Sequence, residues 1–158
     1  METTRHFTAT VYLVNDGATA LHRHDRLGIR VPPGGHVDRD ELPHEAAIRE
    51  AREETGLEAD LVADVTPIEG PNGRGIPEPA HLMLYDINVD ADGRVGHQHV
   101  DHLYFAHADA REVDPTGDDE VGADGWAWYT PADLRAGSFD DDVVELGCEA
   151  IETVMATR

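Results

Sequence analysis

Residues 34–57 read GGHVDRDELPHEAAIREAREETGL, and this stretch decides the fold of the chain. We expect a helix over residues 43–55, because proline stands in its first turn and strong helix formers follow. Gly56 is the stop signal at its end. Leu42 would be the N-cap, a position that usually carries Ser, Thr, Asp or Asn, so the sequence marks the end of this helix more clearly than its start.

Three carboxylates, those of Glu50, Glu53 and Glu54, share one face of this helix, because residues three and four apart are neighbours on a helix. Like charges in contact repel, at roughly 0.2–0.5 kcal/mol per exposed pair. Such a face is stable where a cation fills it, and ligands made only of oxygen suit a hard ion such as Mg²⁺ or Mn²⁺. The glycine turn before the helix would let a backbone carbonyl join them. For three glutamates alone, a solvated acidic face is the alternative.

The whole stretch resembles the Nudix box, the signature G-x5-E-x7-R-E-U-x-E-E-x-G-U of the Nudix hydrolase family. The matching positions, from first to last, are Gly35, Glu41, Arg49, Glu50, Glu53, Glu54, Gly56 and Leu57. From the composition of this chain, the fixed Gly, Glu and Arg positions would match by chance about once in 10⁵ sequences. Residues 32–37 and 128–134 match the flanks of the family more loosely, and Ala51 stands where a larger aliphatic residue is usual.

The resemblance implies an α/β fold, an α/β/α sandwich with a mixed β-sheet. It also implies an enzyme that hydrolyses the diphosphate linkage of a nucleoside diphosphate joined to another moiety, by attack of water on phosphorus. A nucleotide-sensing module without catalysis, built on the same fold, is the alternative. Retention of every carboxylate of the box favours catalysis, since a sensor needs no activated water.

Carried over by position, the resemblance also implies roles for individual residues. The ligands of Mg²⁺ (or Mn²⁺) would be the Gly34 carbonyl and the carboxylates of Glu50, Glu53 and Glu54. Arg49 would orient these carboxylates by ion pairing, and Glu41 would support the loop or a second metal. The acceptor of the proton of water would be a glutamate of the box or an acid on a later loop, with Glu120 and Asp124 as the loop candidates.

The candidate contacts to the substrate are Arg23, Arg30 and His99. The guanidinium groups of Arg23, Arg26 and Arg74 would either clamp phosphate or be ordinary surface arginines. Arg30 stands where many Nudix proteins have a tryptophan. His99 belongs to an alternating pattern on one predicted strand, described next.

On that strand His97, His99 and Asp101 share one face and His102 lies on the other. The pattern is compatible with a transition-metal site or with a polar strand that lines the substrate cleft. We favour the cleft or a plain surface, because a His-rich strand without a fixed ligand spacing is a weak metal signal.

The remaining elements follow from periodicity and turn residues. Strands are expected at residues 7–14, 19–24, 28–31, 59–65, 81–89, 99–108 and 126–130, and helices at a short segment from residue 131 and at residues 142–156. Residues 66–80 hold four prolines and three glycines, which indicates a long loop of the kind that often serves as a lid. In the last helix Val144, Cys148, Ile151 and Met155 form the predicted buried stripe, which argues against the cysteine-dependent Nudix-fold isomerase of isopentenyl diphosphate.

Charge excludes one large class of partner. The 158 residues include 33 acids, 12 arginines and no lysine, for a net charge of −21, so the chain lacks the basic footprint of a protein that binds duplex nucleic acid. An acid excess without lysine resembles the cytoplasmic proteins of extreme halophiles, in which molar salt screens the repulsion. No apolar run approaches ~18 residues, and no apolar leader is present, so we expect a cytoplasmic protein without a membrane span. We expect one domain over residues 1–158, with a homodimer as one possible state. Its partner would be a small nucleotide-type substrate.

Overall fold

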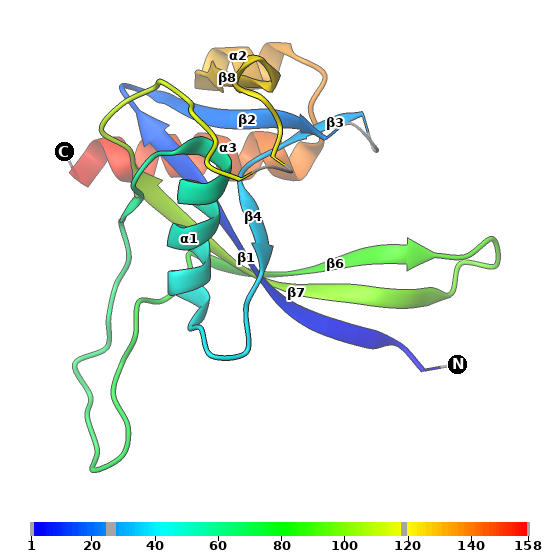
Figure 1. The fold of residues 1–158 in the computed structure, drawn as a ribbon, viewed down its shortest axis with the longest axis vertical. Coiled ribbons are helices and arrows are strands. Elements are labelled where there is room, and N and C mark those ends of the chain that lie inside the picture. Colours follow the sequence, from blue (N-terminus) through cyan, green and yellow to red (C-terminus); the bar gives the residue numbers. More distant parts are fainter. Residues whose placement is uncertain (1, 25–27, 118–119, 158) are drawn as a thin grey trace.

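A computed structural model describes residues 2–24, 28–117 and 120–157. Its centre is a mixed β-sheet with helices on both sides (Figure 1). The strands are β1 (Thr4–Asn15), β2 (Ala18–His24), β3 (Ile29–Val31), β4 (Gly34–His36), β5 (Asp60–Leu61), β6 (His81–Val89), β7 (Val95–His107) and β8 (Trp126–Tyr129). The helices are α1 (Pro43–Thr55), α2 (Pro131–Ala136) and α3 (Asp141–Thr157), with a 3₁₀ turn η1 (Ala123–Gly125) before β8. The α/β class expected from the sequence is confirmed.

The longest pairing in the sheet is parallel. β1 runs beside β7 from Thr4 opposite His97 to Val14 opposite His107, while the other strand pairs are antiparallel. The path through the sheet is β3-β2-β1-β7-β5, with β4 on β1, β6 on β7 and β8 on β2. β1 and β7 therefore form the spine of the molecule, and every other strand attaches to it or to β2.

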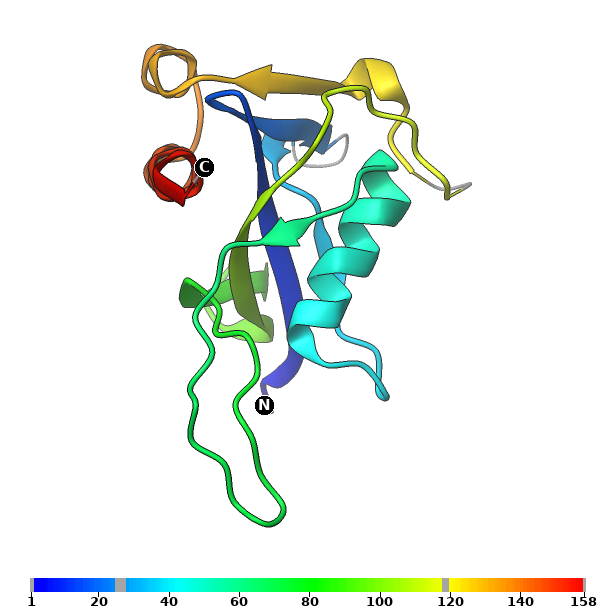
Figure 2. The same cartoon turned by 90° about the vertical axis from the view of Figure 1, so that its left-hand side faces the viewer.

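Alternation along this spine divides the core in two, because successive side chains of a strand point to opposite faces. On one face of the sheet, buried residues of β1 and β7 pack against alanines of α1. This cluster includes Ala9, Val11, Leu13, Tyr104, Ala106, Ala46, Ala47 and Ala51. A second cluster packs against α2 and α3; its buried members include Tyr12, Val14, Leu103, Phe105, Leu134, Val143, Ala150, Ile151 and Val154. Figure 2 shows α1 on one side of the sheet and α3 on the other, which is the expected α/β/α layering.

Helix α1 has the bounds expected from the sequence. At its start, the Leu42 side chain cannot cap the helix, and the Glu45 carboxylate instead accepts a hydrogen bond from the Leu42 N–H at 2.8 Å. At its end, Gly56 adopts φ +75°, and a Cβ at this position would overlap the carbonyl of Asp114. Glycine is thus required there for both its backbone conformation and the close approach of the later chain.

Four expectations need correction. Residues 59–65 contribute only the two-residue strand β5, after which the chain leaves the sheet. β1 and β7 begin earlier than expected. The Gly34–His36 segment, expected as a turn, pairs with β1. On α3 the predicted stripe is displaced: Cys148 is half-buried and Met155 is exposed, while the buried residues are Val143, Leu146, Gly147, Ala150, Ile151 and Val154.

The loop at residues 66–80 is confirmed, and it projects beyond the N-terminal end of α1, away from the sheet (Figure 2). An isolated bridge between Glu69 and Arg74 narrows it near its tip. No helix among the described residues combines the length and the apolar character needed to cross a membrane.

Candidate active site

Arg49 is the centre of a network that joins α1 to the segment before it. Its Nε and Nη2 donate to the two carboxylate oxygens of Glu41, at 2.6 and 3.0 Å, in a fork. Its Nη1 donates to Glu50 at 2.9 Å and to Glu53 at 3.2 Å, and its Nη2 also reaches the backbone carbonyl of His36 at 3.0 Å. The guanidinium group holds the pKa of Glu41 below its usual range, and the carboxylates raise the pKa of Arg49. One arginine thus ties together three acids and β4.

Glu54 and Glu50 lie against the glycines of β4. The Gly34 N–H donates to Glu54 Oε2 at 3.0 Å. A Cβ on Gly35 would overlap the Glu50 carboxylate, so glycine is what allows the strand to pass this close. Burial raises the pKa of Glu54 to about 9, with a contribution from the neighbouring charge of Glu50 and a smaller opposing effect of the Gly34 hydrogen bond. Burial also raises the pKa of Glu50.

A fourth acid approaches from the loop before β8. Glu120 lines the same cleft as Glu54, and its charge contributes to the raised pKa values of Glu50 and Glu54. Asp124, the other loop candidate, lies in η1 and is not among the described residues that line the cleft. The structure therefore brings Glu120, but not Asp124, to the carboxylates of α1.

The cleft itself has a volume of about 950 Å³. It lies on the face of β1 that carries Thr8, Thr10 and Tyr12, opposite the face that packs on α1. Glu54 reaches it past β4. Its acidic lining residues are Glu54, Asp86, Asp101, Glu120, Asp140 and Asp142, and its basic ones are His22, His24, His36 and His99. Among the residues that the structure describes, no arginine lines this cleft.

Arg23 and Arg30 lie outside the cleft because of strand alternation. They face one another across β2 and β3, while their neighbours His22 and His24 line the cleft. The Arg30 guanidinium instead lies 6.0 Å from the centre of the Phe139 ring. Arg74 is in the projecting loop, which contributes no described residue to the cleft, and Arg26 falls outside the described residues.

His99 does line the cleft, beside Asp101, the buried acid of the same alternating pattern. Asp101 is 2% exposed and accepts hydrogen bonds from Thr8 at 2.8 Å and Thr10 at 3.0 Å. Burial raises the pKa of Asp101. The alternation of His97, His99 and Asp101 predicted the shared face, but only the parallel pairing of β1 with β7 brings the two threonines to Asp101.

Tyr85 and Asp142 complete the cleft from the side of α3. The Tyr85 hydroxyl donates to Asp142 at 3.1 Å, and both residues line the cleft. Burial and the charge of Asp142 raise the pKa of Tyr85. The sequence holds no local signal for this contact, because it joins β6 to a helix that begins more than fifty residues later.

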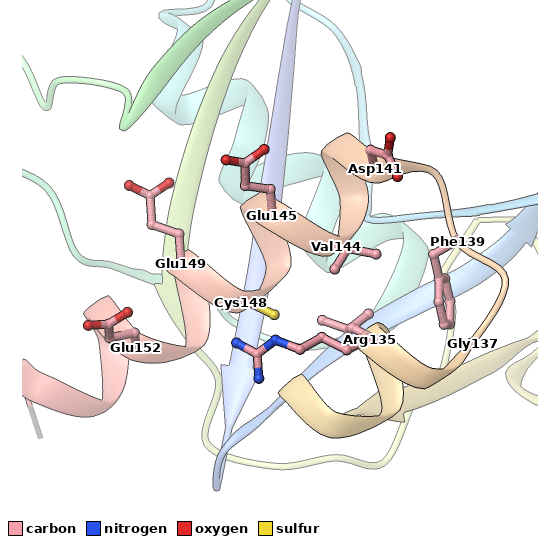
Figure 3. Close-up of a pocket in the computed structure, with 10 residues that line it drawn as sticks. Arg135, Gly137, Phe139, Asp141, Val144, Glu145, Cys148, Glu149 and Glu152 are labelled. Carbon is pink, nitrogen blue, oxygen red and sulfur yellow. The ribbon is translucent and has the colours of Figure 1, made fainter.

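Cys148 lies in a different place. A pocket of about 610 Å³ between α2 and α3 is lined by Cys148 and Arg135 among others. Figure 3 shows the Cys148 side chain between these two helices, near Arg135. It packs against the core on the side of the sheet away from α1, which sets it apart from the carboxylates of Glu50, Glu53 and Glu54.

Comparisons with known proteins agree with this arrangement. The NUDIX domain family matches residues 4–146. The chain is similar to a crystal structure of a NUDIX family hydrolase from Clostridium perfringens, with 29% identity and a TM-score of 0.83 over 96% of this chain and 99% of that one. Its fold also matches a MutT NUDIX hydrolase from Burkholderia pseudomallei, with 24% identity and a TM-score of 0.58 over 96% and 98% of the two chains. With its box on α1 and its sheet in this order, the chain belongs to the Nudix family of hydrolases.

Proposed function

We propose that this protein hydrolyses the diphosphate linkage of a nucleoside diphosphate joined to a second moiety, and that it requires Mg²⁺ or Mn²⁺. One observation carries the proposal: Glu50, Glu53 and Glu54 gather on one face of α1 beside the β4 glycines, with Glu120 close by. Family membership supports a hydrolase of phosphoric anhydride bonds.

The donor set suits a hard divalent cation. It consists of carboxylates, with the Gly34 carbonyl as a further oxygen, and Mg²⁺ and Mn²⁺ prefer such ligands. Burial raises the pKa values of Glu50 and Glu54, so their charged forms are costly in this position, and a bound cation would favour those charged forms. We assign the ion to Glu50, Glu53, Glu54 and the Gly34 carbonyl. When bound, it would neutralise the diphosphate and acidify the attacking water.

The protein's own residues then have distinct tasks. Arg49 holds the Glu50 and Glu53 side chains in place through its Nη1, while its fork to Glu41 fixes the guanidinium group itself. Such positioning matters because a displacement of about 1 Å can cost two orders of magnitude in rate. We assign to Glu120 the acceptance of the proton from water, since of Glu120 and Asp124 it is the one that lines the cleft.

The charge of the cleft supports a need for metal in substrate binding. Its described lining contains six acids and four histidines and no arginine, so side chains alone would repel a diphosphate at neutral pH. His99 stands on the cleft wall as a hydrogen-bonding group for the substrate. Arg23 and Arg30 lie on the face of β2 and β3 away from the cleft, so they do not share this task.

The test is a panel of nucleoside diphosphate derivatives assayed with Mg²⁺, with Mn²⁺ and with chelator. We expect turnover only with the metals, and reaction in ¹⁸O-labelled water should place the label on a phosphate of the product. Full turnover in metal-free buffer would contradict the proposal. Tight nucleotide binding without any turnover across the panel would instead indicate a sensing module.

We further infer that the chain folds and works best in molar salt, because −21 charges repel one another and salt at about 1 M shortens the Debye length to roughly 3 Å. The free energy of unfolding and the rate should both rise between 50 mM and 2 M KCl. Equal stability and activity at the two concentrations would refute this adaptation without touching the enzymatic proposal.

A further inference from the structure

Four histidines gather where β4, β1 and β7 run side by side. Ring centres lie 4.5 Å apart for His6 and His97, 5.2 Å for His6 and His36, 5.0 Å for His36 and His99, and 5.1 Å for His97 and His99. The register explains the gathering, because His36 pairs opposite Thr8 on β1, and His6 pairs opposite His99 on β7. Residues paired in this way, and those two positions along, point to the same face of a sheet.

Three of these side chains converge on one point. His6, His36 and His97 each offer a ring nitrogen, and these three nitrogens all lie within 4.8 Å of one another. Nitrogens bound to one tetrahedral zinc ion are about 3.3 Å apart, given Zn–N bonds of about 2.0–2.1 Å. His6 and His36 are exposed, so rotation of their rings can close the remaining gap without moving the sheet.

His97 also has a hydrogen-bond partner outside the three-histidine group, as metal-binding histidines commonly do. Thr4 Oγ1 lies 2.8 Å from His97 Nδ1, which engages one ring nitrogen and leaves the other for a metal. Such a contact fixes the orientation of the ring before the metal arrives. Thr4 and His97 are paired directly across β1 and β7, so the partner comes from the sheet itself.

We propose that His6, His36 and His97 form a binding site for a transition-metal ion of the zinc class, separate from the carboxylate site on α1. Imidazole ligands suit Zn²⁺, Ni²⁺ and Cu²⁺, whereas Mg²⁺ and Mn²⁺ prefer oxygen. The two sites therefore select different metals by the chemistry of their ligands. His99 lines the cleft, as we favoured, whereas His6, which the strand pattern did not include, completes the metal-binding group with His36 and His97.

The site bears on the active site through β4. The His36 ring belongs to the three-histidine group, while its backbone carbonyl accepts a hydrogen bond from Arg49 at 3.0 Å. A metal held by His6, His36 and His97 would join β4 to β1 and β7 through side chains in addition to the backbone pairing of β4 with β1. It would hold in place the strand that carries Gly34 and Gly35.

The test uses the full chain, stripped of metal and kept without Mg²⁺, titrated with Co²⁺ while its visible absorption is followed, and then with Zn²⁺ in competition. We expect one Co²⁺ per chain to show the absorption of a nitrogen-bound ion, beside any Co²⁺ that the carboxylates of α1 hold. His6→Gln, His36→Gln and His97→Gln should each weaken binding at least about tenfold, and Thr4→Val by roughly tenfold. His81→Gln, which changes an exposed histidine paired with Glu149, is the matched control and should bind as wild type does.

Glu53→Gln separates the two sites and should leave Co²⁺ binding at the histidines unchanged. The proposal is overturned if the histidine variants bind Co²⁺ as wild type does while Glu53→Gln loses it, because the ion then sits on α1. It is equally overturned if wild type binds no Co²⁺ or Zn²⁺ at micromolar concentrations. If circular dichroism shows that a histidine variant does not fold, the electron paramagnetic resonance spectrum of Cu²⁺ bound to wild type tests the site instead. We expect this spectrum to show coupling to several nitrogens. A spectrum with oxygen ligands alone would overturn the proposal.

Discussion

Helices α1 and α3 cover opposite faces of the same two strands, yet they are built differently. α1 buries alanines, Ala46, Ala47 and Ala51, and its Arg49, Glu50 and Glu54 contact β4. α3 buries larger side chains, including Leu146, Ile151 and Val154, and contributes one acid, Asp142, to the cleft. The alanine contact lets α1 lie close to the sheet, so that Glu54 and Glu50 reach the glycines of β4. One helix thus mainly positions charged groups, and the other mainly buries apolar surface.

The largest effect should come from neutralising one carboxylate of α1. Glu54→Gln keeps the size of the side chain and should lower turnover by orders of magnitude, because a ligand of the proposed cation is lost. Assays with Mg²⁺ at saturating substrate measure this. Turnover close to that of wild type would show that Glu54 is structural and would break the contrast between the two helices.

The same variant makes a prediction about pH in the absence of metal. The pKa of Glu54 is about 9 in the folded protein and near 4.3 in the unfolded chain. The folded state therefore binds the proton more tightly, and this contribution to the free energy of unfolding is present below pH 4.3 and is lost as pH rises toward 9. In urea unfolding of metal-free protein at pH 5.5, 7 and 8.5, the free energy of unfolding of wild type should fall relative to that of Glu54→Gln as the pH rises. Parallel pH dependences of the two proteins would contradict this.

A change on α3 should affect stability alone. Ile151→Ala removes a side chain that is 5% exposed in the core and should lower the free energy of unfolding by about 2–5 kcal/mol. Turnover per folded molecule should stay at the wild-type level, since no described carboxylate of the box packs on α3. A loss of turnover with full folding would mean that α3 also positions the active site.

A change on the buried face of α1 should affect both properties. Ala47→Leu adds three carbon atoms at a fully buried position and should cost about 1–3 kcal/mol by overpacking. It should also lower turnover, because the helix must move away from the sheet and take its carboxylates with it. Melting curves beside an assay distinguish this outcome from the Ile151→Ala result; reduced stability with unchanged turnover would show that the spacing of α1 is unimportant.

The smallest effect belongs to the half-buried thiol. Cys148→Ala should lower the free energy of unfolding by about 1 kcal/mol or less and leave turnover unchanged, because the side chain lies between α2 and α3. A large loss of turnover with intact stability would revive a cysteine-dependent reaction.

Local signals in the sequence were sufficient for α1. Proline in the first turn, Gly56 at the end and the spacing of the glutamates predicted its bounds and its charged face. The loop at residues 66–80 was equally readable from its prolines and glycines. Those signals act within a few residues, so they do not depend on how the rest of the chain folds.

The parts that sequence reasoning missed depend on distant pairing. Two glycines at 34 and 35 indicate a turn, but β1 converts the segment into β4 by supplying partners for its backbone. The face of β2 that carries Arg23 follows from its pairing with β3 and β8, which no local pattern specified. On α3, the buried stripe is displaced by one residue from the predicted one, because the place of the helix on the sheet decides which side is covered.

The parallel pairing of β1 with β7 has a consequence for folding during synthesis on the ribosome. Partners such as Thr4 and His97 are 93 residues apart, so β1 leaves the ribosome long before β7 exists. At about 5–20 residues per second, the wait lasts roughly 5–20 s. During that time Val11, Leu13 and Val14, all fully buried later, are uncovered in a segment of high β-propensity, which is a hazard for aggregation. The acidic residues synthesised in the meantime make unfinished chains repel one another. The same negative charge that destabilises the folded protein therefore reduces aggregation of the nascent chain.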